Sequence, residues 1–148
     1  MTRSKMKQQV FEGVDITNSL GAIPPQSNDG DAVTGAAIDR LGAGTGFFLF
    51  EAAAASGTPS AVTAALKITH CDTSGGTYAD FEVLETALDI KTAVAKQYMI
   101  DLSGAKRYLK VVLDSTYTAG TTPANVVAGK LILGDYDVDP KASQTILS

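Results

Sequence analysis

The feature that most restricts the possible folds of this chain is a series of strand-length apolar segments separated by turn residues. In residues 62–71 apolar side chains alternate with polar or small ones, which predicts a strand with one buried and one wet face. A turn-forming segment, residues 72–78, ends that run, and further apolar segments occupy residues 98–114 and 124–136. Turn signals recur between short strands and no strand–helix–strand rhythm appears, so the sequence predicts an all-β antiparallel sandwich or barrel.

Seven or eight strands are expected in total. Residues 46–51, an aromatic and aliphatic run, predict a strand buried on both faces. Residues 98–102 and 108–114 predict a hairpin that turns at residues 103–105, and residues 126–136 predict the last strand. Residues 82–96 have leucine and alanine at helical spacing, which predicts a short helix or a loop across one end of the sandwich. The turn formers of residues 20–35 predict a short strand and a long loop.

Length and charge exclude several classes of protein. A chain of 148 residues is one ordinary domain and can bury a core without disulfides or metals. The net charge is −4 and the basic residues form no long run, which disfavours direct nucleic-acid binding. Cys71 is the single cysteine, so no intrachain disulfide is possible. No apolar stretch is long enough to cross a membrane, and no signal-peptide core follows the basic N-terminus, so a soluble protein that is not exported is expected.

The chain divides into an extended N-terminal arm (residues 1–19), a β-sandwich body (residues 20–139) and a C-terminal tail (residues 140–148). Val10, Phe11, Val14 and Ile16 are the apolar anchors by which the arm is expected to contact a partner. An extended arm can add a strand to an exposed sheet edge through backbone hydrogen bonds. A strand of the protein's own sheet and a disordered terminus remain open alternatives.

The candidate chemical sites all have ordinary structural explanations. His70 and Cys71 are adjacent in a strand, where consecutive side chains point to opposite faces, so a Cys–His dyad is disfavoured. Asp135, Asp137 and Asp139 alternate and could in principle hold Ca²⁺, but they lack the loop and terminal glutamate of an EF-hand.

Three short motifs are likewise expected to be structural. Residues 28–31 are typical of a turn, and the glycine-rich residues 42–46 lack the Lys-Ser/Thr of a phosphate loop. Residues 106–108, Lys-Arg-Tyr, are expected at a solvated hairpin corner because the cluster is too small for a nucleic-acid patch. The sequence therefore predicts no catalytic residues, no cofactor site and no metal site.

Four segments in one order carry a family resemblance. Residues 37–41 (AIDRL), 72–80 (DTSGGTYAD), 101–111 (DLSGAKRYLKV) and 131–136 (LILGDY) resemble small structural proteins of tailed bacteriophages. The resemblance covers about residues 36–140. It implies a capsid cement or decoration protein with a jelly-roll-like sandwich. Such proteins lie on the outer face of the shell as small oligomers and bridge neighbouring major capsid subunits.

The expected function is therefore structural and not enzymatic. The implied partners are the major capsid protein and further copies of this chain, as a dimer or trimer, and the implied location is the virion after synthesis in the host cytoplasm. A tail-tube or head-completion protein is the alternative within the structural class. A carbohydrate- or receptor-binding sandwich is the alternative from another class, although the absence of Trp removes the best sugar-stacking residue.

Overall fold

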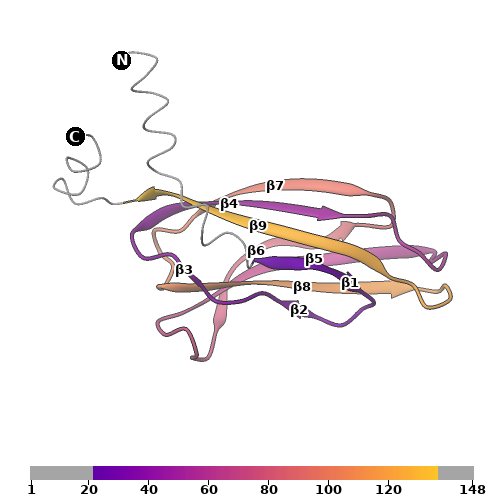
Figure 1. Ribbon diagram of the computed structural model, residues 1–148, viewed down its shortest axis with the longest axis horizontal. Helices are drawn as coiled ribbons and strands as arrows, with labels where there is room; N and C mark the ends of the chain where they lie inside the picture. Colours follow the sequence, from indigo (N-terminus) through magenta and orange to yellow (C-terminus); the bar gives the residue numbers. More distant parts are fainter. Residues whose placement is uncertain (1–21, 137–148) are drawn as a thin grey trace, which may run out of the picture.

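The computed structural model describes residues 22–136, which form two antiparallel β-sheets packed face to face (Figure 1). The strands in chain order are β1 (Ile23–Asn28), β2 (Val33–Thr34), β3 (Ile38–Asp39), β4 (Ala43–Ala52), β5 (Ala61–Cys71), β6 (Ala79–Asp89), β7 (Val94–Asp101), β8 (Tyr108–Thr118) and β9 (Asn125–Tyr136). The four-stranded sheet has the order β1-β9-β4-β7, and the five-stranded sheet has the order β2-β8-β5-β6 with β3 also paired to β8. Residues 22–136 contain no helix long and apolar enough to cross a membrane.

The pairing pattern is that of a jelly roll. Early strands pair with late ones as in a long hairpin: β1 with β9, β2 and β3 with β8, β4 with β7, and β5 with β6. Folding that hairpin over itself adds the β4–β9 and β5–β8 contacts and produces two stacked sheets. If β2 and β3 are counted as one interrupted strand, the described residues contain eight strands. The predictions of an all-β sandwich and of seven or eight strands are confirmed.

One hydrophobic core fills the space between the inner faces of the two sheets. The alternation predicted for residues 62–71 is confirmed over residues 62–68, where inward side chains of β5 are buried and the alternate ones only partly so, whereas Thr69 and Cys71 are also buried. The largest fully buried side chains come from both sheets: Phe48, Phe50, Ile23, Leu66, Ile68, Ile90, Ile100, Leu102, Leu109, Leu113, Leu131 and Leu133. Burying each of them stabilises the fold by about 1.5–3 kcal/mol relative to exposure.

The prediction that residues 46–51 are buried on both faces is wrong. Along β4, Phe48 and Phe50 are fully buried, whereas Phe47 and Leu49 are only partly buried and Glu51 is exposed. A sandwich has a single core, so each sheet has one inner face. Within residues 22–136 no third layer covers the outer face of β4.

The predicted hairpin between residues 98–102 and 108–114 is also wrong. Its turn exists, since the amide of Ala105 donates to the carbonyl of Leu102 at 3.0 Å. However, β7 pairs with β4 in one sheet and β8 pairs with β5 in the other. The turn therefore connects the two sheets. In this jelly roll β7 and β8 each pair with a strand that is distant in the sequence, and not with each other.

Residues 82–96 form neither a helix nor a loop. They belong to β6 and β7, joined by a turn in which the amide of Lys91 donates to the carboxylate of Asp89 at 2.9 Å. The register between β5 and β6 shifts at three places, and the burial of β6 loses its alternation. These bulges interrupt the alternation of buried and exposed side chains along β6, which is the sequence pattern that identifies a strand. The turn at residues 28–31 is confirmed: the side-chain amide of Asn28 donates to the carbonyl of Asp31 at 2.6 Å.

Candidate interaction surface

The outer face of the four-stranded sheet is the strongest candidate for a functional surface, and we call it the β4 face. It consists of outward side chains from three neighbouring strands: Thr45, Phe47, Leu49 and Glu51 of β4; Ala95, Gln97, Met99 and Asp101 of β7; and Val126, Ala128, Lys130 and Ile132 of β9. The inward residues of these strands fill the core, so the alternation of a strand places this second set on the outside.

Strand register orders nine of these twelve residues into three rows across the sheet, with Thr45 and Asp101 beyond the first row and Val126 beyond the third. The bulky row is Met99, Phe47 and Ile132; the middle row is Gln97, Leu49 and Lys130; and the small row is Ala95, Glu51 and Ala128. Residues directly opposite one another on neighbouring strands contact on one face, so each row is continuous. Large apolar side chains therefore occupy one half of the face and alanines the other.

The bulky row is exposed to solvent to an extent that folding does not explain. Met99 is 70% exposed, Phe47 and Ile132 are partly covered by their neighbours, and partly covered Leu49 of the middle row adjoins them. Single exposed apolar side chains are ordinary, but a contiguous apolar patch with a polar rim is typical of an interaction site. The β4 face has that composition.

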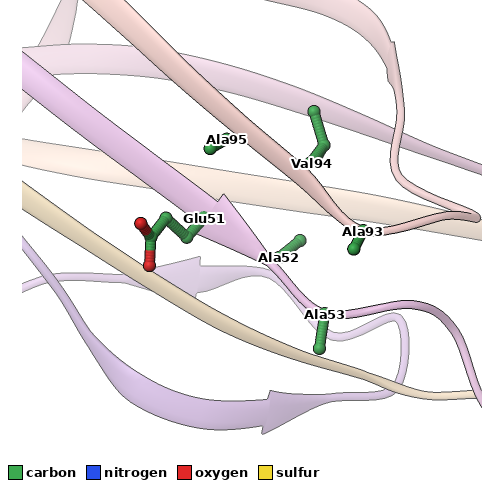
Figure 2. Close-up of a pocket in the computed structure, with 6 residues that line it drawn as sticks. All are labelled: Glu51, Ala52, Ala53, Ala93, Val94 and Ala95. Atoms are coloured by element: carbon green, nitrogen blue, oxygen red, sulfur yellow. The ribbon is translucent and has the colours of Figure 1, made fainter.

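The small row is hollowed on both sides of Glu51. One shallow depression is lined by Glu51, Ala52, Ala53, Ala93, Val94 and Ala95, where β4 ends and β7 begins (Figure 2). A second is lined by Leu49, Glu51, Ala128, Gly129 and Lys130. Both depressions exist because alanines stand on the outer face where larger side chains would fill the surface. Their shallow, open shape suits an inserted side chain of a partner.

Two opposite charges stand on the β4 face without a partner from the described chain. Neither Glu51 nor Lys130 makes an ion pair or a side-chain hydrogen bond with any side chain that the structure describes. Both side chains line the same depression. Each charge is therefore available to a group of opposite sign on a partner.

On the outer face of the five-stranded sheet, which we call the β5 face, both lysines are engaged within the chain, whereas exposed Asp114 has no ion pair among the described residues. Lys67 forms an ion pair with Asp80 at 2.7 Å, and the ammonium of Lys110 lies 4.5 Å from the centre of the Tyr78 ring. The hydroxyl of Thr69 donates to the carbonyl of Lys110 at 3.3 Å. These contacts tie β5, β6 and β8 to one another and use the groups that a partner would otherwise engage.

The corner at residues 106–108 is solvated, as predicted, although no hairpin forms there. Arg107 makes a two-pronged contact with Asp39, with nitrogen–oxygen distances of 3.1 and 2.8 Å, and its guanidinium lies 5.1 Å from the centre of the Tyr108 ring. The hydrogen bonds from Arg107 hold the pKa of Asp39 below its usual value. Lys106 pairs with Asp72 at 3.1 Å. Both cations of this corner are therefore engaged within the chain.

A hydrogen bond at the open edge joins the two sheets. The hydroxyl of Tyr98, on β7, donates to the carboxylate of Glu85, on β6, at 3.0 Å, and its ring stacks on Phe48 at 6.1 Å between centroids. Burial, together with this hydrogen bond, raises the pKa of Tyr98 well above its usual value. Tyr98 is therefore a structural tyrosine that stays neutral.

His70 and Cys71 do not act together. The Nδ1 atom of His70 accepts a hydrogen bond from the backbone amide of Lys106 at 3.1 Å, and its ring lies 5.0 Å from that of Phe81. Cys71 is only 8% exposed, and its sulfur lies 3.9 Å from the hydroxyl of Thr73. Both residues have structural surroundings, which agrees with the argument against a dyad.

Several predicted site residues lie outside the described part of the chain. These are Val10, Phe11, Val14 and Ile16 of the arm, and Asp137 and Asp139; the side chain of Asp135 is also not described. Among residues 22–136, no group of three or more His, Cys, Asp or Glu side chains is arranged to hold a metal ion.

Sequence reasoning missed the β4 face because it assigned both sides of residues 46–51 to the core. The usable signal was the pairing of outward Phe47 with two other apolar residues, Met99 and Ile132. That pairing depends on strand register between distant segments. A single segment does not contain it.

Comparison with known proteins supports the fold. No family model matches the sequence, and no curated protein matches it. Two chains from structures of infectious bursal disease virus, the Gx and Gt strains, have TM-scores of 0.57 at 12% and 13% identity. The similarity covers 87% of this chain but only 34% and 33% of the viral chains, so this chain spans about a third of their length. At this identity the similarity establishes a shared β-sandwich architecture.

A sugar-binding protein is also among the similar structures. The C-terminal domain of EclA has a TM-score of 0.47 at 14% identity, over 80% of this chain and 74% of that domain. In the present chain a cation lies over each of the two tyrosine rings at the corner of the β5 face, with Lys110 at Tyr78 and Arg107 at Tyr108.

Proposed function

We propose that this protein is a structural component of a virion, and specifically a cement or decoration protein on the outer surface of a tailed-phage capsid. The observation that carries the proposal is the β4 face of the jelly roll. On this face apolar side chains form a row, two shallow depressions lie beside Glu51, and Glu51 and Lys130 have no partner among the described side chains. Such a surface suits a protein partner of either proposed kind, a capsid subunit or a second copy of this chain. The sequence resemblance to phage structural proteins supplies the capsid as the setting.

Stabilising a shell requires only modest affinity per copy. A protein that binds the assembled shell and not its separated subunits shifts the equilibrium toward assembly by its differential affinity. Many copies on one particle multiply a contribution of a few kcal/mol each. The partners we propose are therefore the major capsid protein and further copies of this chain, with no enzymatic activity, no cofactor, no nucleic acid and no membrane.

Shell binding tests the proposal directly. The purified protein is mixed with expanded empty phage shells that lack it, the shells are sedimented, and the pellet is imaged by cryo-electron microscopy. Ordered external density in a fixed ratio to the capsid subunits is the expected result. Rings or tubes formed by the protein alone, with bare shells, would instead favour a tail-tube or head-completion protein.

Deletion of residues 1–19 tests the arm. We propose that Val10, Phe11, Val14 and Ile16 anchor the protein to a neighbouring capsid sheet. The truncated protein is expected to keep the unfolding temperature of the full chain but to occupy shells less. Unchanged occupancy would show that the arm is not the anchor, whereas loss of folding would show that residues 1–19 belong to the body.

A further inference from the structure

We infer that the β4 face is the interface of a two-fold symmetric dimer, so its partner is the β4 face of a second copy of this chain. The inference rests on the proposed function and deepens it. A seam between two identical capsid subunits has local two-fold symmetry, and a dimer would present two equivalent capsid-binding surfaces to it.

Shape is the first argument. A two-fold axis along the middle row turns the face onto itself and exchanges its two halves. The bulky row of one copy, Met99, Phe47 and Ile132, then lies over the hollowed small row of the other. Large and small residues alternate across packed sheets in the same way, because protrusions must meet depressions for the layers to interdigitate.

Charge is the second argument. In this arrangement Glu51 would be covered by the apolar bulky row of the partner, which is costly for a carboxylate without a counter-charge. Because the axis lies along the middle row, the two Lys130 side chains face each other, and a Glu51 carboxylate from each copy lies one row away on either side of them. The two-fold repeats the contact, so both copies pair Glu51 with Lys130 of the partner. This use explains why neither charge has a partner within residues 22–136.

The size of the face sets the expected strength. Three strands about 4.8 Å apart and eight residues of about 3.3 Å each span roughly 14 by 26 Å, or about 370 Å² before side-chain relief is counted. A standard interface buries roughly 800 Å² per partner. The dimer is therefore expected to be weak and concentration-dependent in solution and to be reinforced on the shell, where neighbouring copies are held close together.

Charge reversal of the full-length protein, followed by sedimentation velocity between about 5 and 500 μM, is the primary test. Glu51→Lys leaves two cations on each face, and Lys130→Glu leaves two anions. Each single variant is expected to raise the dimer dissociation constant at least about tenfold. The double variant E51K/K130E restores the pairs and is expected to dimerise like the unchanged protein.

A matched pair of apolar substitutions is the second test. Met99→Glu, on the edge strand of the four-stranded sheet, is expected to abolish dimerisation. Val83→Glu is the control, because Val83 is 57% exposed on β6, the edge strand of the other sheet. The unfolding temperatures of both variants, measured at low micromolar concentration, verify that each is folded.

Three results would overturn the inference. They are an unchanged protein that is monomeric up to 500 μM, a trimer, or a dimer insensitive to both Met99→Glu and the charge reversals. None of them touches the proposed function, which is read from shell binding. Conversely, a dimer that behaves as expected but leaves shells bare would uphold the interface and overturn the capsid role.

Discussion

The two outer faces of this sandwich cover the same core but differ in how many of their charged side chains have partners within the chain. On the β5 face, Lys67 pairs with Asp80 and Lys110 lies over Tyr78, so both lysines find partners within the chain, although Val83 is exposed. On the β4 face, Met99 is exposed and Glu51 and Lys130 stand alone among the described residues. Both faces are backed by equally well-buried inner residues. The difference between them therefore does not arise from the needs of folding.

Exposed apolar side chains and unpaired charges on a domain whose core is complete favour association with another molecule. Such groups contribute little to the stability of an isolated domain. The β5 face, whose lysines have partners within the chain, is less suited to such association. The β4 face is therefore the side that we propose for contact with partners.

The largest expected effect tests which side of β4 faces the core. Phe48→Ala empties a fully buried position and is expected to lower the free energy of unfolding by about 3–5 kcal/mol. Phe47→Ala, one residue earlier on the outer side, is expected to cost less than half as much. Denaturant unfolding at low protein concentration measures both. Equal losses would show that the β4 face is covered and the comparison of faces is wrong.

The next effect concerns a glycine that lies between the core and the β4 face. A Cβ atom at Gly129 would come within 2.8 Å of the buried Phe48 ring, so Gly129→Ala is expected to cost about 1–3 kcal/mol by overpacking. Ala128→Ser, the neighbouring position on the outer side, is the control and is expected to change stability by less than about 0.5 kcal/mol. Thermal or denaturant unfolding would contradict the assignment if the two substitutions had equal effects.

Double-mutant cycles sharpen the comparison of charges. The cycle for Lys67 and Asp80, with each replaced by alanine, is expected to give a coupling of about 0.2–1 kcal/mol, typical of an exposed ion pair. The same cycle for Glu51 and Lys130, at concentrations where the protein is monomeric, is expected to give a coupling near zero. A strong coupling between Glu51 and Lys130 in the monomer would remove the basis for an intermolecular pair.

The smallest effect is a pH dependence at the corner of the β5 face. Because the hydrogen bonds from Arg107 lower the pKa of Asp39 below its ordinary value of 3.8, the pair stabilises the fold above that pH. The contribution is lost as the pH falls through the lower pKa of the folded state. The unfolding temperatures of the unchanged protein and Asp39→Asn are therefore expected to differ at pH 6 and to converge toward pH 2. A constant difference across that range would show that the effect of the substitution is not ionic.

Local patterns predicted the architecture where the strands are regular. The sequence predicts strands β5 and β9 because every second side chain along a regular strand faces the core, which leaves an alternating apolar pattern in the sequence. The pattern failed in β6, where three register shifts against β5 destroy the period. It also failed at residues 103–105, where a correct turn was assigned to a hairpin although it connects two sheets.

The sequence by itself determined that this chain is an all-β sandwich with one core, because turn residues and alternating apolar side chains are local properties. Only the tertiary structure decided which strands are neighbours and therefore which residues form the β4 face. Phe47, Met99 and Ile132 come from three distant segments, and their row exists only in the register of β7, β4 and β9. Register depends on how the whole jelly roll closes around its core, which no single segment encodes.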